Sequence, residues 1–500
     1  MFKQFEASAI KTPDAPFLID PNGAELTYSA ASELIKKIAG AYALLGVKPG
    51  DRIAVQVDKS PMALLAYLAS QFCGAVFLPL NTAYTAGELS YFLEDAAPTL
   101  FLCRPEDSER AEQLCKATGV PCCATLGLVN GSFNKIVEGD VPSPQQVEYD
   151  PERLAAILYT SGTTGRSKGA MLSGANLLSN AQTLLKLWRF SASDRLLHAL
   201  PIYHTHGLFV ATNVTICAGA AMIFLPNFSV DAVLSALPDA TVMMGVPTYY
   251  SRLLERNDFD RASASRMRLF ISGSAPLSPE VHSAFRARTG HTILERYGMT
   301  ETNMNTSNPY DGDRIPGSVG PALPGVELRI VDRESGTTLS DGEFGMIEVR
   351  GPNVSRGYWN NPAKTAEAFR IDGFFITGDL GYRDAQGYVF IMGRANDLII
   401  SGGFNIYPAE VENVLDAVAG VQESAVIGVP HPDLGEAPIA LIKVSELDVD
   451  QDFVIGAITD QLARYKQPRR ILIVDELPRN AMGKVQKAVL RKHYGEIFSA

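Results

Sequence analysis

The sequence of 500 residues lacks an apolar run long enough to cross a membrane. The two uncharged stretches that come nearest begin at Pro61 and Gly207, and a glycine, Gly74 or Gly219, interrupts each near its middle. Each half has about a dozen residues or fewer, whereas a spanning helix needs about 20. We therefore interpret each stretch as a helix, a glycine and a buried strand, and expect no membrane partner.

Paired cysteines and an excess of basic charge are also absent. The six cysteines show no CxxC spacing and no paired framework, which favours a reducing compartment, so we expect a cytoplasmic protein. The opening residues, MFKQFEASAI, lack the apolar core of a secretory signal. A net charge of −11 argues against nucleic acid as a partner, because backbone binding needs a basic surface. Nothing in the sequence indicates the oligomeric state.

What is present is the composition of an ordinary globular protein, with 46% hydrophobic and 20% charged residues. Helical patterns alternate with short buried strands, such as RIAVQV at 52–57 and MRLFISG at 267–273. This alternation predicts an α/β fold with largely parallel sheets. From about residue 319 short strands separated by turns replace it, which predicts a small barrel-like β unit over residues 319–394.

A fresh α+β pattern begins after Arg394. It contains an expected helix at 408–418 and an expected strand at 423–429. We therefore predict a large N-terminal domain, residues 1–394, built from two packed α/β sheets plus the β unit. A smaller, mobile α+β C-terminal domain, residues 395–500, follows it.

A loop rich in glycine and small hydroxyl residues, YTSGTTGRSKGA at 159–170, follows an apolar run. Such residues let backbone N–H groups turn toward one point, and the cations in the loop favour an anion there. The spacing differs from the usual P-loop, because Lys168 stands between Ser167 and Gly169. Taken alone, the loop could be a phosphate cradle or an ordinary surface hairpin.

With four later motifs, this loop resembles the ATP-dependent acyl-adenylate-forming enzymes, which include acyl-CoA synthetases, luciferases and peptide-synthetase adenylation domains. The motifs stand in the family's order and are ERYGMTET (295–302), FFITGDLG (374–381), GRANDLIISGGFNIYPAEVE (393–412) and PRNAMGKVQK (478–487). The chain is most similar to malonyl-CoA synthetases, through LPIYHTHGLF (200–209) and LERYGMTETNMNTSNPYDGDR (294–314). The resemblance implies ATP, Mg²⁺ and CoA, with malonate or methylmalonate as the acid.

The resemblance also implies which residues hold the nucleotide. Glu301, with Thr160, is expected to bind Mg²⁺, and Asp379 to accept hydrogen bonds from both ribose hydroxyls. Arg394 is expected to reach the ribose or a phosphate. The phosphate loop is expected to use Thr160, Ser161, Gly162, Thr163, Thr164, Gly165 and Lys168. The pocket for the AMP moiety is expected to use Gly273, Ser274, Ala275, Pro276, Glu295, Arg296, Tyr297, Gly298 and Met299.

Catalysis is expected in two steps within one cleft. By the resemblance, Lys484 bridges the acyl carboxylate and the α-phosphate during adenylation, and the C-terminal domain then rotates. Gly402 and Gly403 would border a narrow channel for the CoA thiol. The expected catalytic residues are Lys484, His204, Glu301 and Thr300. Asn396 stands at the hinge position, where relatives usually carry Asp or Lys.

Arg296 indicates a second acidic group on the substrate. A buried guanidinium without a partner is costly, so a pocket that contains one is expected to receive an anion. The alternative is that Arg296 pairs with Glu295 or another acidic residue and never contacts the substrate. Arg252, expected at the start of a helix, is the second candidate. The residues expected to complete the pocket or limit its size are His206, Ser274, Thr205 and Met304.

Three other functions stay open. The acid could be a short or aromatic monocarboxylate, or the chain could be a nucleotide-sensing module with a degenerate site. The presence of Lys484, Glu301 and His204 argues against degeneracy. A free-standing peptide-synthetase adenylation unit is the third, which we do not favour because no carrier domain follows residue 500.

Overall fold

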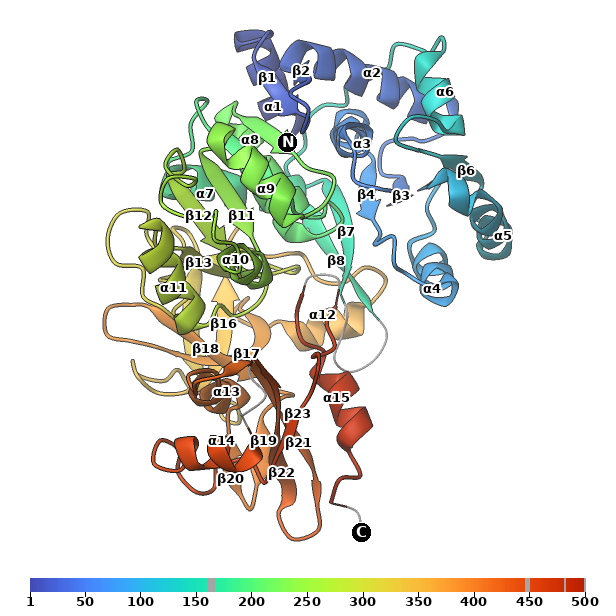
Figure 1. The fold of residues 1–500 in the computed structure, drawn as a ribbon. Coiled ribbons are helices and arrows are strands. Elements are labelled where there is room, and N and C mark those ends of the chain that lie inside the picture. The colour runs from blue at the N-terminus through green and yellow to red at the C-terminus, as the bar shows by residue number, and fades with distance from the viewer. Residues whose placement is uncertain (161–166, 446–449, 481–482, 499–500) are drawn as a thin grey trace.

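A computed structural model describes residues 1–160, 167–445, 450–480 and 483–498. The expected α/β fold is confirmed, with two large mixed sheets in residues 1–307 and two smaller sheets after them (Figure 1). In the described part of the chain, no helix is both long and apolar enough to cross a membrane.

One large sheet has six strands, and the glycine-rich loop belongs to it. In spatial order these are β6 (Cys122–Thr125), β5 (Leu100–Cys103), β3 (Arg52–Gln56), β4 (Val76–Pro79), β7 (Leu154–Thr160) and β8 (Lys168–Ser173). Neighbours run parallel except β7 and β8, which are antiparallel. The glycine-rich loop therefore connects two antiparallel neighbours at this edge of the sheet.

Helices alternate with these strands, and their ends carry the expected signals. They are α2 (Tyr28–Leu44), α3 (Pro61–Cys73), α4 (Ala86–Ala96), η1 (Pro105–Asp107), α5 (Ser108–Thr118), α6 (Ser132–Glu138) and α7 (Gly174–Leu187). In α3, the Ser60 hydroxyl accepts from the Ala63 N–H, and Gly74 ends the helix at φ 72°. Strand β4 then follows, so this stretch is a helix, a glycine and a buried strand as predicted.

The second large sheet has eight strands. In spatial order these are β14 (Asn303–Ser307), β13 (Leu294–Met299), β12 (Leu269–Ser272), β11 (Val242–Gly245), β9 (Arg195–His198), β10 (Ala221–Phe224), β1 (Pro16–Ile19) and β2 (Glu25–Thr27). Strands β9, β11, β12 and β13 run parallel. Their carboxyl ends therefore share one edge, where loops bearing functional groups converge.

The helices of this half include one that the sequence did not predict. They are α1 (Phe2–Lys11), η2 (His206–Thr212), α8 (Asn213–Ala218), α9 (Val230–Ala236), η3 (Leu237–Asp239), α10 (Pro247–Leu254) and α11 (Pro279–Thr289). Element η2 is a π-helix, a rare form that is frequent at functional sites. It runs into α8, and Gly219 at φ 65° separates α8 from β10.

An antiparallel sheet of four strands forms the β unit. It contains β15 (Glu327–Val331), β16 (Gly345–Arg350), β17 (Phe375–Arg383) and β18 (Val389–Arg394), with α12 (Pro362–Ala368) in the connection between β16 and β17. The register of β17 and β18 sets Asp379 directly opposite Arg394.

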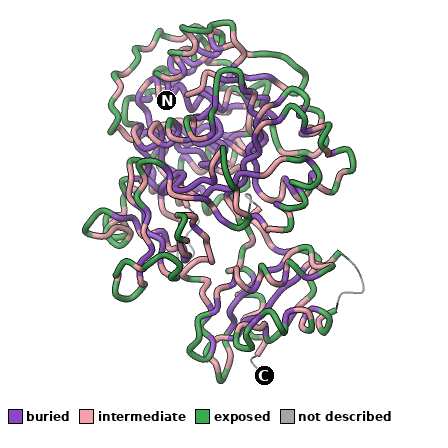
Figure 2. Tube along the Cα trace, turned by 90° about the vertical axis from the view of Figure 1, so that its left-hand side faces the viewer, coloured by how far each residue is buried: buried purple, intermediate pink, exposed green. Residues whose placement is uncertain are grey.

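The last hundred residues form their own sheet and core. The sheet contains β20 (Phe404–Ile406), β19 (Ile399–Ser401), β22 (Gly435–Val444), β21 (Val421–His431) and β23 (Arg470–Ile473), and the helices are α13 (Pro408–Asp416), α14 (Gln451–Ile458) and α15 (Lys487–Tyr494). Two hydrophobic clusters draw all their members from residue 399 onward. Figure 2 shows this buried interior at the lower end of the molecule, apart from the larger core above it.

Candidate active site

Arg296 is buried without a partner at the carboxyl edge of the eight-stranded sheet. Its side chain comes from β13 and is 3% exposed. Among the described residues, its Nε and one terminal nitrogen find no hydrogen-bond acceptor. Burial lowers the pKa of Arg296 to about 9. A buried cation left unpaired is costly, so this point of the molecule is suited to an anion.

Glu295 does not neutralise Arg296. Successive residues of a strand point to opposite faces, and Oε1 of Glu295 has no hydrogen-bond partner among the described residues. Burial raises the pKa of Glu295 to about 8. The alternative in which Glu295 pairs with Arg296 therefore finds no support in the structure.

Two histidines lie close to Arg296. His206 is the first residue of η2, and its Nδ1 lies 3.2 Å from Oγ of Ser274. Burial, followed by the charge of Arg296, lowers the pKa of His204 to about 4 and that of His206 well below its usual range. Both rings are therefore neutral at pH 7. Nε2 of His206 and the hydroxyl of Thr205 are buried and accept or donate no hydrogen bond within the described residues.

Of the two remaining residues predicted for the acid pocket, Met304 is buried and Arg252 is exposed. Met304 is buried on β14, and its methyl group lies where a Cβ on Gly298 would stand. Arg252 was predicted at the start of a helix, but α10 begins at Pro247, so Arg252 is in its last turn and is exposed. That position corrects the prediction, and Arg252 is not part of the buried cluster around Arg296.

Asp379 forms the centre of a second cluster. It is 5% exposed, receives a hydrogen bond from the hydroxyl of Tyr297, and forms an ion pair of 2.8 Å with Nε of Arg394. Arg394 also donates to the carbonyl of Thr377 at 2.9 Å, and the charge of Asp379 raises its pKa. A carboxylate has about four acceptor sites, so Asp379 keeps capacity for further donors.

Glu301 is a buried carboxylate next to the phosphate-loop strand. It is 7% exposed and has no ion-pair partner among the described residues. The hydroxyl of Tyr358 donates to its Oε1 at 3.0 Å, and the ring of Tyr358 lies 4.3 Å from Nζ of Lys168. The described residues contain no group of three or more metal-ligating side chains. A single carboxylate fits Mg²⁺, which usually takes one or two carboxylates and fills its other positions with phosphate and water.

The structure describes several other residues that were predicted to bind the nucleotide. Thr160 ends β7, and its hydroxyl donates to the carbonyl of Lys168 at 3.4 Å. Thr300 is half-buried next to Glu301. The segment Gly273, Ser274, Ala275 and Pro276 follows β12, with Ser274 at φ 75°, while Tyr297, Gly298 and Met299 end β13. The predicted phosphate-loop residues Ser161, Gly162, Thr163, Thr164 and Gly165 lie outside the described residues.

Lys484 faces this site from the C-terminal part of the chain. A Cβ on the preceding Gly483 would lie 3.2 Å from Oγ1 of Thr248 in α10, so the lysine loop touches the N-terminal part. The Lys484 side chain remains accessible to solvent, yet the surrounding protein lowers its pKa by desolvation, followed by the charge of Arg394. Opposing contributions come from Asp379 and Asp397.

Gly402 and Gly403 are exposed to solvent in this arrangement. They form the turn between β19 and β20, with φ of 57° and 84°. A Cβ on Gly403 would meet nothing within 4 Å, and one on Gly402 would meet only Leu434. The glycine turn therefore lies on the surface of the C-terminal part.

Sequence reasoning missed the half-buried Lys59 and the buried His198, which lie behind η2. Nζ of Lys59 donates to Nδ1 of His198 at 2.9 Å and to its carbonyl at 2.7 Å. Because a carbonyl only accepts, Nε2 of His198 donates to the carbonyl of Gly207 at 3.0 Å, and Nδ1 of the neutral ring accepts from Lys59. No motif marks this contact, which joins residues far apart in the sequence.

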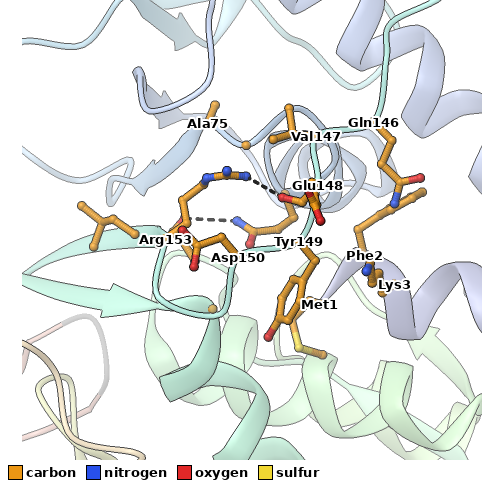
Figure 3. A pocket seen from close by; sticks show the side chains of 15 residues that line it. Met1, Phe2, Lys3, Ala75, Gln146, Val147, Glu148, Tyr149, Asp150 and Arg153 are labelled. Carbon is orange, nitrogen blue, oxygen red and sulfur yellow. Dashed lines mark hydrogen bonds between the residues drawn. The ribbon is translucent and has the colours of Figure 1, made fainter.

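A separate cavity of about 40 Å³ lies elsewhere, between α1 and the start of β7. Figure 3 shows Arg153 donating to the carbonyl of Glu148 in its wall, with Tyr149 and Met1 nearby. None of the candidate site residues lines it.

Comparisons with known proteins fit this geometry. The family described as AMP-binding enzyme matches residues 5–359, and the AMP-binding enzyme C-terminal domain matches residues 410–484. The mitochondrial malonate–CoA ligase of Mus musculus is 36% identical and covers 90% of this chain and 83% of its own. The sulfoacetate–CoA ligase of Cupriavidus necator is 35% identical, with coverage of 97% and 96%.

Among solved structures, ATP-bound MatB from Rhodopseudomonas palustris is 50% identical and covers 99% of both chains. Its TM-score is 0.97, whereas apo MatB from the same organism has a TM-score of 0.85. The arrangement of the structure described here is therefore more similar to that of the ATP-bound structure than to that of the apo structure.

Proposed function

This chain belongs to the AMP-binding enzyme family, and from that premise we propose that it is a malonyl-CoA synthetase. It is an AMP-forming acid–thiol ligase that uses ATP and CoA. The proposed reaction converts ATP, malonate and CoA to malonyl-CoA, AMP and diphosphate through an enzyme-bound malonyl-adenylate. Methylmalonate is a second proposed acid.

The observation that carries the proposal is the unpartnered guanidinium of Arg296. Malonate has a second carboxylate, and a guanidinium can bind a carboxylate through two parallel hydrogen bonds. Such a pair satisfies Nε and the terminal nitrogen that lack acceptors among the described residues. A monocarboxylate leaves the buried cation unpaired, so selectivity against it should be steep. The malonate–CoA ligase and MatB similarities support the same acid.

For adenylation, we propose that one malonate carboxylate attacks the α-phosphorus of ATP and diphosphate leaves. The ammonium of Lys484 would stabilise charge on the attacking carboxylate and the α-phosphate, and its electrostatic interaction with Arg394 and Asp379 supports this role. Asp379 holds the ribose hydroxyls, and Thr300 and His204 line the reacting groups. Glu301 would hold Mg²⁺, which neutralises phosphate charge when bound.

The acid pocket would be completed by neutral groups. His206 and Ser274 are linked to each other at 3.2 Å and can orient the distal carboxylate. Thr205 and Met304 would limit the substituent on the carbon between the carboxylates, which sets malonate and methylmalonate apart from larger diacids.

For thioester formation, we propose that residues 395–500 act as a lid that rotates near Asn396. Lys484 would then leave the site, and Gly402 and Gly403 would approach it, bordering a channel for the CoA thiol. The thiol attacks the acyl carbon of the adenylate and AMP leaves. The exposed glycine turn and the ATP-bound arrangement support the view that this structure is the adenylating state.

Diphosphate release with a panel of acids tests the substrate. The panel is malonate, methylmalonate, sulfoacetate, acetate, propionate and butyrate, each with and without CoA. We expect kcat/KM for malonate to exceed that for each monocarboxylate by at least about a hundredfold. Sulfoacetate also carries a second anion, so a preference for it would keep the role of Arg296 and change the acid. Strong activity with butyrate would refute the proposal.

Two arginine variants complete the test. Arg296→Ala should lower kcat/KM for malonate by at least about a hundredfold, because the distal carboxylate loses its charged partner. Arg252→Ala is the matched control, since Arg252 is exposed at the end of α10, and it should keep the parent value. Full malonate activity in Arg296→Ala would remove the basis for a diacid substrate.

A cytoplasmic location remains part of the proposal. All six cysteines are free thiols in the structure, which suits a reducing compartment.

A further inference from the structure

Tyr358 joins two parts of the nucleotide site that are distant in the sequence. Its hydroxyl donates to Oε1 of Glu301 at 3.0 Å, and the face of its ring lies 4.3 Å from Nζ of Lys168. Tyr358 is 5% exposed and comes from neither of the motifs that contain these two residues. It therefore contacts both a proposed metal carboxylate and a proposed phosphate-binding cation.

The backbone holds the Tyr358 ring independently of its hydroxyl. The residue forms a β-bridge with Ala170, and the next N–H, of Trp359, donates to the carbonyl of Gly169 at 2.7 Å. The Tyr358 N–H itself donates to Oγ1 of Thr365 at 2.9 Å. Segment 357–359 is thus fastened to β8, the strand that begins with Lys168.

The hydroxyl acts as a donor toward Glu301. Burial, followed by the charge of Glu301, raises the pKa of Tyr358, so the phenol keeps its proton. The carboxylate of Glu301 is ionised when it binds a metal, and a donor on Oε1 fixes its orientation. No described residue donates to Oε2 of Glu301, so that oxygen is left for a cation.

We propose that Tyr358 is a positioning residue that holds Glu301 and Lys168 in one arrangement for MgATP. The inference rests on the proposed function, because that function gives Glu301 and Lys168 their roles. The hydroxyl orients the metal carboxylate, and the ring face keeps the Lys168 ammonium beside the phosphates through a cation–π contact. The two contacts are chemically separate, so two variants can remove them one at a time.

The first measurement is metal binding without turnover. Mn²⁺ is titrated into enzyme plus ATP in the absence of acid, and free Mn²⁺ is followed by electron paramagnetic resonance. Tyr358→Phe keeps the ring and removes the donor, so the Kd for Mn²⁺ should rise about tenfold. Tyr28→Phe is the matched control, since its buried hydroxyl donates to the carbonyl of Ala220 at 2.8 Å, away from this site. It should bind Mn²⁺ as the parent does.

The second measurement is binding of ATP in the presence of EDTA. Without metal, the ammonium of Lys168 contributes to binding and the Glu301 contact does not. Tyr358→Phe should keep the parent Kd, whereas Tyr358→Leu removes the ring face and should raise it about threefold. Thermal unfolding of all variants checks that each one folds.

The outcomes separate this inference from the proposed function. If Tyr358→Phe binds Mn²⁺ as tightly as the parent, or loses ATP binding in EDTA as Tyr358→Leu does, the inference is wrong. If the parent binds Mn²⁺ and ATP but forms no adenylate with any acid, the proposed function fails while the expected pattern still supports Tyr358. A parent that binds no Mn²⁺ with ATP overturns both.

Discussion

Gly273 and Arg296 are in direct contact, and the contact leaves no room for a side chain on residue 273. A Cβ there would lie 2.7 Å from Nε of Arg296. The contact follows from the sheet, because β12 and β13 pair in parallel with Ser272 opposite Glu295. Gly273 therefore forms one wall of the space that the guanidinium occupies.

We expect Gly273→Ala to displace the guanidinium without unfolding the protein. The added methyl meets the end of a long side chain rather than backbone, so Arg296 can shift, but it then leaves its position for the distal carboxylate. KM for malonate should rise about tenfold, because a charge-assisted hydrogen bond is lost. Steady-state kinetics and thermal unfolding measure this. A parent-like KM would show that the position of the guanidinium does not matter for the acid.

The pH dependence of kcat/KM for malonate should follow the protonation of Arg296. Burial lowers its pKa to about 9 in the free protein, and only the protonated form attracts a carboxylate. The value of kcat/KM for malonate should therefore be constant below pH 8 and fall as pH rises through about 9. Bound malonate favours the protonated form, so it raises the pKa of Arg296 in the complex.

Desolvation lowers the pKa of Lys484, which also loses its proton as pH rises, so the measurement must separate the two groups. Loss of the Lys484 proton lowers adenylation even at saturating malonate, so it affects kcat as well. The Arg296 titration should lower kcat/KM for malonate at a pH where kcat is still unchanged. If kcat and kcat/KM fall together, Arg296 is not the group that titrates.

The sequence predicted the layers of the fold because burial patterns are local. The strands predicted at 52–57 and 267–273 correspond to β3 and β12 in the structure. The uncharged stretch that begins at Pro61 forms the predicted helix, glycine and strand. Which strands are neighbours is a long-range property. The parallel pairing that brings Gly273 to Arg296 could not be read from either motif.

The sequence predicted those site residues that belong to recognisable motifs, but not the contacts that only the fold creates. Arg296 and Glu295 are adjacent in sequence and could have paired, but strand geometry turns them to opposite faces. The prediction put Arg252 at the start of a helix because it set the helix boundary too late. Pro247, at the first position of α10, is a signal for the true start. Tyr358 was missed because it meets Glu301 and Lys168 only in the folded chain.

Asp379 should contribute to binding of the ATP ribose, and a nucleotide that lacks one ribose hydroxyl tests this contribution. Asp379→Asn removes the charge that is expected to accept from the hydroxyls, so the Kd for ATP should rise about tenfold. In the parent, 2′-deoxy-ATP should bind more weakly than ATP. In the variant, the two nucleotides should bind alike, because the acceptor for the 2′-hydroxyl is already weakened.

The control for Asp379 addresses its other partners. Tyr297→Phe removes the hydroxyl that donates to Asp379 but leaves the carboxylate and its 2.8 Å ion pair with Arg394. It should keep the discrimination between ATP and 2′-deoxy-ATP. Equal discrimination in the parent and Asp379→Asn, measured by titration calorimetry, would assign Asp379 to the fold rather than to the ribose.

Lys484 should be required for one half-reaction only. Its loop touches Thr248 here, and Arg394 and Asp379 are among the charges around it, which supports the proposed adenylating arrangement. Lys484→Ala should lower malonate-dependent diphosphate release by at least about a hundredfold, because it removes charge stabilisation at the reacting phosphate. Transfer from supplied malonyl-adenylate to CoA should stay within about threefold of the parent, since the proposed rotation removes Lys484 before that step. Lys487→Ala is the matched control, because Lys487 pairs with Glu412 at 2.6 Å within the C-terminal part, and it should keep the first half-reaction. Equal losses in both half-reactions of Lys484→Ala would contradict a lid that works in two positions.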